Sequence, residues 1–232
     1  MCHGAAVSVF PEAHLGEVYD GDIYGYQYGD PSASKHIAIF PDIYGANPLY
    51  QGLALRFAEK GARATLLDPY TPLGELPEPT REHAFARRMK LRDKTYLDQV
   101  EAYSEKEGVT GIVGFCLGGL YIFELARRAA KPDLVGLYGF PQGLPNDDGI
   151  PVPFDYLTSV TRSFTMLMGR LDEPVTTEVM DKLSAMAPDC PAMDLTMYPN
   201  AGHGFIADLD SDDPEARAVA EDALARLDAA LL

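Results

Sequence analysis

Residues 111–119 read GIVGFCLGG, an apolar run followed by a turn in which a cysteine stands among glycines. The run predicts a buried strand, and the apolar residues within 117–130 predict a helix that begins directly after the turn. A strand, a tight turn and a helix in this order present one side chain at the tip of the turn, in a strained backbone conformation. Side chains two positions before and after Cys116 would collide with the strand and the helix, and both positions, Gly114 and Gly118, are glycine. The segment therefore predicts that Cys116 is held for chemistry at the end of a strand.

Cys116 is the candidate nucleophile. The thiolate is the attacking form of cysteine, and the N-terminus of a helix stabilises negative charge. The backbone N–H of Leu117, the first residue of the predicted helix, would donate to the oxyanion formed by attack on a carbonyl. The structural alternative is an inert buried cysteine beside glycines that let a helix pack closely. The strand and the helix that flank the turn favour the reactive cysteine.

Outward from this segment, short apolar runs alternate with longer amphipathic stretches. Strands are predicted over residues 36–40, 64–68, 134–138, 164–168 and 194–198, with one or two short strands before them, and helices over residues 48–60, 81–107, 175–186 and 214–231. The last helix is the clearest, because Asp213 can cap it and Pro214 suits its first turn. This alternation predicts an α/β fold with a mostly parallel central sheet and helices on both faces, formed by one domain over residues 1–232.

Two further polar residues follow predicted strands. Residues 169–174 read GRLDEP directly after one apolar run, and residues 201–205 read AGHGF shortly after the run that ends at Tyr198. Ligands of such sheets bind beyond the carboxyl ends of the strands, so His203 would accept the thiol proton while Asp172 orients its imidazole. The chain order of nucleophile, acid and histidine is that of the α/β-hydrolase fold. Glu173 competes for the role of the acid, and a surface histidine and a turn aspartate are the structural alternatives.

Composition argues against several classes of partner. With 19 basic and 35 acidic residues, the formal charge of −16 repels nucleic acid and anionic lipid. We expect no membrane partner, because no apolar run is long enough to span a bilayer. The beginning of the chain has no secretory pattern, which predicts a cytoplasmic protein. Neither a metal-binding set nor a phosphate-binding glycine loop appears, so no metal and no cofactor are expected.

The three cysteines, Cys2, Cys116 and Cys190, are too widely spaced for a disulfide framework or a metal pattern. They fit a reducing compartment. Cys2 and Cys190 are expected to be unreactive. The oligomeric state is left open by the sequence.

These residues resemble the dienelactone hydrolase family from about His36 to the end of the chain. The similarity is carried by residues 41–47 (PDIYGAN), 114–119, 169–172 and 202–205. It implies carboxymethylenebutenolidase-type chemistry, in which a thiolate attacks the carbonyl of a small lactone or ester, the ring opens and water releases the acid. A cysteine in the elbow makes the resemblance more specific, because most α/β-hydrolases use serine there.

The resemblance also implies roles for residues outside the predicted triad. Ile43 would supply the second N–H of the oxyanion hole. Asp42 stands where the family usually has a glutamate that holds the resting thiol, and it is one methylene shorter. Arg81 resembles an arginine that binds a substrate carboxylate, and Phe85 replaces a tyrosine. A second arginine usually follows the histidine, but residues 206–208 read IAD, so dienelactone itself is not assured as the substrate. A loop cap at Asp42 and a solvated helix start at Arg81 are the structural alternatives.

Two other functions remain open at this point. One is a broad esterase or thioesterase that acts on small esters. The other is a noncatalytic thiol redox sensor, because a cysteine of low pKa also oxidises readily. The presence of His203 and Asp172 favours catalysis, since a sensor needs neither residue.

Overall fold

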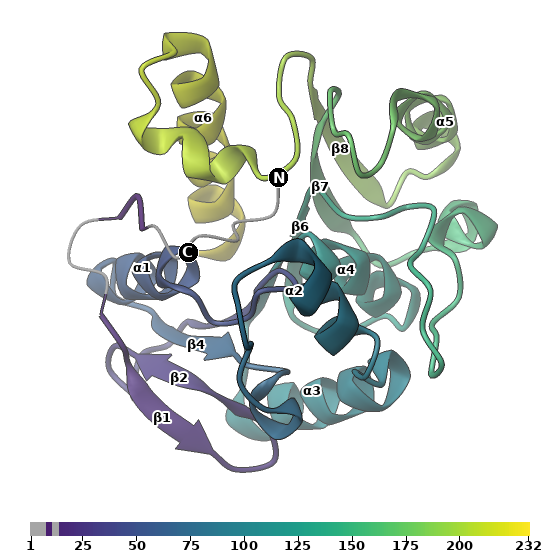
Figure 1. Ribbon diagram of the computed structural model, residues 1–232. Helices are drawn as coiled ribbons and strands as arrows, with labels where there is room; N and C mark the ends of the chain where they lie inside the picture. The colour runs from purple at the N-terminus through teal and green to yellow at the C-terminus, as the bar shows by residue number, and fades with distance from the viewer. Residues whose placement is uncertain (1–7, 11–13) are drawn as a thin grey trace.

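The computed structural model describes residues 8–10 and 14–232 and contains, within them, an eight-stranded sheet in the order β1-β2-β4-β3-β5-β6-β7-β8 (Figure 1). The strands are β1 (Glu17–Asp20), β2 (Tyr24–Tyr28), β3 (His36–Phe40), β4 (Arg63–Leu67), β5 (Gly111–Phe115), β6 (Asp133–Leu137), β7 (Phe164–Gly169) and β8 (Met193–Tyr198). The six strands from β4 to β8 in this order are parallel, whereas β2 is antiparallel to both of its neighbours. The predicted α/β fold with a mostly parallel sheet is confirmed.

Helices cover both faces of the sheet. They are α1 (Pro48–Glu59), α2 (Arg81–Arg88), α3 (Asp93–Glu107), α4 (Leu117–Arg127), α5 (Thr177–Met186) and α6 (Pro214–Leu231). α1 and α6 lie on one side and α3 and α4 on the other (Figure 1). Both terminal nitrogens of Arg56 in α1 donate hydrogen bonds to the carboxylate of Asp228 in α6, at 2.7 and 2.6 Å. These bonds join the two helices on the first face of the sheet. The caps follow the sequence, as the side chain of Asp213 accepts the N–H of Glu215 at the start of α6.

The polar stretch expected as one helix over residues 81–107 is divided into α2 and α3. The chain turns between them at residues 89–92, and the turn brings Arg88 and Asp93 together, with Nη2 and Oδ2 at 2.6 Å. Both side chains are almost completely buried. Residues five apart do not face each other on a continuous helix, so the break is what allows this buried ion pair to form.

The core lies on both faces of β3 and β5. Parallel strands are buried on both sides, which explains why their sequences are continuous apolar runs rather than alternating ones. Every residue of β3 and β5 is buried. β5 pairs with β3 on one side and with β6 on the other, so the segment that follows β5 emerges in the middle of the sheet.

Candidate active site

The turn between β5 and α4 has the backbone geometry expected of a nucleophile elbow. Cys116 has φ 57° and ψ −110°, a conformation that costs a residue other than glycine about 1–3 kcal/mol. A Cβ atom on Gly114 would collide with the carbonyl oxygen of Gly118, and one on Gly118 would lie 2.5 Å from the Cβ of Phe40. Both glycines are therefore required by close packing around the strained cysteine.

Cys116 is buried at the N-terminus of α4. Its backbone N–H donates to the carbonyl of Leu137 at 3.1 Å, which fixes the elbow against the end of β6. The backbone N–H groups in the first turn of a helix have no intrahelical acceptor, and the helix dipole places positive charge there. Leu117 begins this turn, so its N–H is one of the donors that can bind an anion.

His203 and Asp172 form a buried pair. The Nδ1 of His203 lies 2.7 Å from the Oδ2 of Asp172, and both side chains are almost fully excluded from solvent. The other carboxylate oxygen of Asp172 accepts the N–H of Val175 at 3.1 Å. Glu173 is exposed, so Asp172 is the residue that contacts the histidine. A carboxylate that accepts from Nδ1 sets the tautomer in which Nε2 is the basic nitrogen.

Cys116, Asp172 and His203 follow the carboxyl ends of three strands, β5, β7 and β8, at the same edge of the sheet. Between them lies Tyr138, whose ring centroid is 5.0 Å from that of His203 and 6.0 Å from that of Phe115. The ring of Tyr138 thus packs against both Phe115, the residue before Cys116, and the imidazole of His203.

Tyr138 and Phe140 are parts of the site that sequence reasoning missed. The ring of Phe140 lies 5.7 Å from that of His203, so the two aromatic rings pack around the imidazole. Tyr138 was expected inside a strand, but β6 ends at Leu137 and Tyr138 has φ 38°. Tyr138 could have been predicted as a site residue, because it follows a buried strand at the edge of the sheet where the other candidates lie.

The turn after β3 contains Asp42 and Ile43. The Oδ1 of Asp42 accepts the N–H of Tyr44 at 2.8 Å, and its carbonyl accepts the N–H of Gly45 at 3.0 Å. The carboxylate therefore caps this loop, as the structural alternative expected. Both Asp42 and Ile43 are buried. Since Phe40 packs against Gly118, this turn lies beside the first turn of α4.

Arg81 and Phe85 lie at the solvent-exposed end of α2. Arg81 is the first residue of the helix and is exposed, and Phe85 is 37% exposed. The buried positions of this helix are Ala84 and Arg88. The structure thus places Arg81 at the surface, while an arginine two turns later on the same helix is inside the protein.

Cys190 contrasts with Cys116. Its thiol donates to the carbonyl of Leu157 at 3.0 Å, and burial raises its pKa above the usual value, so it is poorly suited to be a nucleophile. Cys2 lies outside the described residues. Among residues 8–10 and 14–232, no group of three His, Cys, Asp or Glu side chains is arranged to hold a metal ion. The helices in the described part of the chain include none that is long and apolar enough to cross a membrane.

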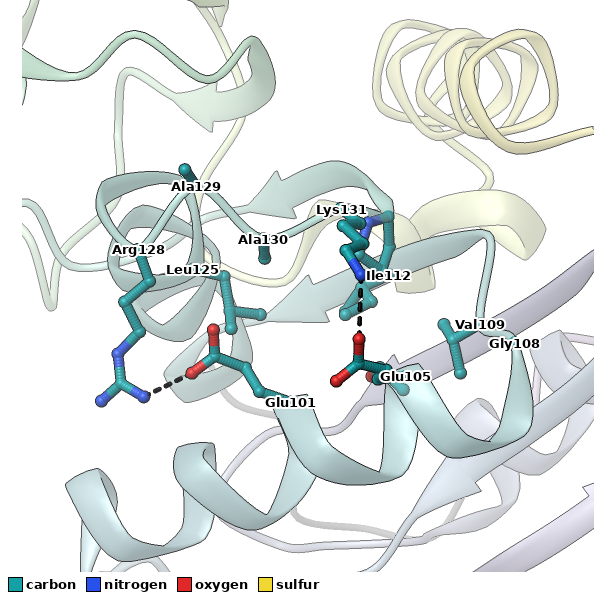
Figure 2. Close-up of a pocket in the computed structure, with 12 residues that line it drawn as sticks. Glu101, Glu105, Gly108, Val109, Ile112, Leu125, Arg128, Ala129, Ala130 and Lys131 are labelled. Carbon is teal, nitrogen blue, oxygen red and sulfur yellow. Dashed lines mark hydrogen bonds and ion pairs between the residues drawn. The ribbon is translucent and has the colours of Figure 1, made fainter.

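A cavity of about 350 Å³ lies at the opposite edge of the sheet from Cys116 (Figure 2). It is lined by residues that precede β5 and β6 and by the end of α4. Ion pairs between Glu101 and Arg128, at 2.6 Å, and between Glu105 and Lys131, at 2.9 Å, border it. Its position at the amino ends of the strands separates it from the candidate catalytic residues.

The sequence is similar to those of known proteins. The model of the dienelactone hydrolase family matches residues 23–230. The chain is 42% identical over 222 residues to carboxymethylenebutenolidase 2 of Cupriavidus pinatubonensis (strain JMP 134 / LMG 1197), an alignment that covers 95% of this chain and 94% of that protein. It is 30% identical to the carboxymethylenebutenolidase of Rhodococcus opacus, over 97% of this chain and 94% of that one.

The fold is also found among solved structures. The crystal structure named "Putative Dienelactone Hydrolase" from Klebsiella pneumoniae subsp. pneumoniae MGH 78578 superposes with a TM-score of 0.73 at 20% identity, covering 94% of this chain and 95% of that one. This similarity concerns the fold, whereas the family model and the two relatives concern the sequence. The chain is therefore a member of the dienelactone hydrolase family of α/β-hydrolases.

Proposed function

We propose that this protein hydrolyses a small lactone or ester through a covalent acyl intermediate on Cys116. The observation that carries the proposal is the buried His203–Asp172 pair, at 2.7 Å, at the edge of the sheet where the strained cysteine begins α4. A histidine whose tautomer is fixed by a carboxylate is the general base that activates a nucleophile of this kind.

The chemistry begins with transfer of the Cys116 thiol proton to the Nε2 of His203. The thiolate sulfur forms a bond to the lactone carbonyl carbon, and the carbonyl oxygen becomes an oxyanion. The backbone N–H groups of Leu117 and Ile43 donate to this oxyanion. The bond to the ring oxygen then breaks, and that oxygen takes the proton from the imidazolium. A water, deprotonated by His203, attacks the thioester, and the thiolate leaves with the proton, which frees the acid and restores the thiol.

Substrate preference is proposed from the relatives. Both are named carboxymethylenebutenolidases, and the butenolide in that name is a lactone that bears a carboxylic group. We assign to Arg81 the role of an outer cation that attracts this carboxylate and to Phe85 a place beside it. The Asp42 carboxylate, buried in the neighbouring turn, is proposed to restrain the resting thiol. A thiol nucleophile must stay reduced, which favours the cytoplasm as the site of action.

The redox-sensor alternative is disfavoured by burial. Sensor cysteines are solvent-accessible, whereas Cys116 is 1% exposed. A broad esterase or thioesterase would use the same residues, so only substrates separate it from a lactonase. Turnover of a panel of lactones and p-nitrophenyl esters by the wild-type protein makes this distinction.

The proposed triad predicts non-additive losses. His203→Ala should lower kcat by about three orders of magnitude or more, and the double variant with Cys116→Ala should be little worse than either single variant. Cys190→Ala is the matched control, since it removes the other described buried cysteine without touching the site. Losses that multiply in the double variant, or full activity in Cys116→Ala, would contradict the proposal.

A further inference from the structure

Three buried hydrogen-bond donors beside the candidate site have no partner among the described residues. They are the Nη1 of Arg88, the hydroxyl of Tyr70 and the hydroxyl of Tyr96. The three residues are 0%, 1% and 7% exposed. Nearly all buried polar groups in folded proteins are hydrogen-bonded, because burying one without a partner is costly. Three such donors in one region are available to a ligand that brings hydrogen-bond acceptors.

Arg88 is anchored to the helix that carries the nucleophile. Its Nη2 donates to the Oδ2 of Asp93 at 2.6 Å, and the hydroxyl of Tyr121 donates to Oδ1 of the same carboxylate at 2.7 Å. Tyr121 lies in α4, only five residues after Cys116. The ion pair thus fixes the end of α2 and the start of α3 against the first turns of α4. The Nη1 of Arg88 remains available as a hydrogen-bond donor.

Tyr96 reaches the same place from α3. Its ring centroid lies 6.3 Å from that of Tyr121 and 6.1 Å from that of Phe40, and the latter two rings are 5.3 Å apart. Phe40 in turn packs against Gly118, in the first turn after the nucleophile. Tyr96 is therefore linked through Phe40 to the first turn after the nucleophile.

Tyr70 joins this group from the segment after β4. Burial raises its pKa far above the usual value, and the charges that also act on its hydroxyl belong to Arg88, Asp42, Arg87 and Cys116. The hydroxyl is thus within electrostatic reach of both the guanidinium of Arg88 and the thiol. The guanidinium of Arg87 stacks on the ring at 4.3 Å and fixes it from the outside.

The chemistry of the three groups selects an anion. A guanidinium can only donate, and both phenols stay protonated at neutral pH because burial raises their pKa values. The region also contains two buried carboxylates: that of Asp93 already receives one hydrogen bond on each oxygen, and that of Asp42 accepts the N–H of Tyr44. What the region offers to a ligand is therefore a set of donors, including one cation.

We propose that Arg88, Tyr70 and Tyr96, here called the donor cluster, bind the carboxylate of a carboxylated lactone while its ring carbonyl lies at Cys116. The inference rests on the proposed function and adds to it the residues that determine specificity. Within the donor cluster, Arg88 of α2 supplies the second cation that residues 206–208, IAD, do not provide after the histidine. A site built of buried donors strongly rejects a substrate that lacks the matching acceptor, because its donors are then left unpaired.

The test compares a carboxymethylene-substituted butenolide with the same butenolide lacking the carboxylate. The variant Tyr70→Phe/Tyr96→Phe removes two hydroxyls that have no partner within the described chain, so the protein should remain as stable as the wild type. The ratio of kcat/KM for the carboxylated over the neutral lactone should fall about ten- to a hundredfold, since each hydrogen bond to a charged group contributes roughly tenfold.

Tyr156→Phe is the matched control. Tyr156 is also a buried tyrosine whose hydroxyl has no partner among the described residues, but it lies against Arg127 at the far end of α4. Its replacement should leave the ratio unchanged. If Tyr156→Phe changes the ratio as much as the double variant does, the effect is not specific to the donor cluster and the inference fails.

The arginine is tested in Arg88→Met/Asp93→Asn, which removes both charges of the buried pair together and so avoids an unpaired buried charge. The ratio should fall by about a hundredfold in this variant, with circular dichroism used to confirm that it is folded. Should it not fold, the tyrosine variants decide the question. Equal losses on both lactones, or a wild-type protein with no preference for the carboxylated one, would overturn the donor cluster. Hydrolysis that still depends on Cys116 in either case would leave the proposed function standing.

Discussion

At the scale of single residues, two arginines seven positions apart on one helix face are placed very differently. Arg81 is exposed at the N-terminus of α2, and Arg88 is completely buried at its end. Residues seven apart lie on the same face of a helix, about 10 Å apart along its axis. An exposed cation is screened by water and salt, whereas a buried one is screened much less. The exposed Arg81 is therefore suited to attract an anionic substrate from solution, and the buried Arg88 to bind its carboxylate within the protein.

This contrast predicts a modest role for Arg81. Arg81→Ala should lower kcat/KM for a carboxylated lactone by about two- to fivefold, the range of exposed charge pairs, and the loss should disappear in high salt. Lys131→Ala removes an equally positive side chain at the opposite edge of the sheet and is the control. A large loss that persists in high salt would show that Arg81 enters the site in the complex, and equal losses on neutral lactones would make it structural.

At the scale of secondary-structure elements, the strands and most of the helices were predictable, whereas the division of the polar stretch over residues 81–107 was not. The strand over residues 36–40 has the predicted bounds, and the others differ by about one residue, because buried parallel strands are continuous apolar runs with sharp ends. The elbow was predictable for a similar local reason, since its glycines are fixed by contacts within a few residues.

The parts that escaped prediction depend on contacts distant in the sequence or on the exact end of an element. The break between α2 and α3 is stabilised by a buried ion pair whose members look like ordinary surface charges in the sequence. Tyr70 and Tyr96 could be assigned to the core, but only the folded chain shows that their hydroxyls meet no acceptor. Tyr138 contacts the histidine because β6 ends one residue earlier than its apolar pattern suggests.

His36 joins three elements at the edge of the sheet opposite the site. Its Nε2 lies 2.8 Å from the Oγ1 of Thr65 in β4, and its Nδ1 lies 3.1 Å from the carbonyl of Glu107 at the end of α3. Burial lowers its pKa below the usual 6.5, an effect that the charge of Arg63 reinforces and that the hydrogen bond to Glu107 and its charge oppose. The folded protein therefore holds this imidazole neutral.

This junction predicts a loss of stability in mild acid. Since the folded pKa is depressed, the unfolded chain binds the proton first, so the stability contribution is full above the unfolded pKa and declines as the pH falls below it. Chemical denaturation at about pH 7.5 and about pH 5 should show a smaller decline in His36→Gln than in the wild type. His83→Gln, at a histidine whose side chain is 42% exposed, is the control. An identical decline in the wild type and in His36→Gln would show that His36 makes no contribution.

At the scale of the whole molecule, the formal charge of −16 acts on both stability and substrate encounter. Like charges repel one another in the compact state, and the same field repels an anionic lactone as it approaches. The buried donor cluster acts only at short range, within the protein, where salt screens little. Varying the ionic strength therefore separates repulsion of the lactone by the acidic surface from its attraction by the buried donor cluster.

Raising NaCl from about 10 mM to about 0.5 M shortens the screening length from roughly 30 Å to a few Å. The melting temperature should rise by a few degrees, since about 1 kcal/mol corresponds to 2–4 °C in a chain of this size. In the same range kcat/KM for a carboxylated lactone should increase and that for a neutral lactone should stay constant, because only the anion is repelled. Asp210→Asn/Asp212→Asn removes two exposed charges from the −16 and should weaken both salt effects. If kcat/KM for the anion instead falls with salt, attraction by exposed cations such as Arg81 outweighs the acidic surface.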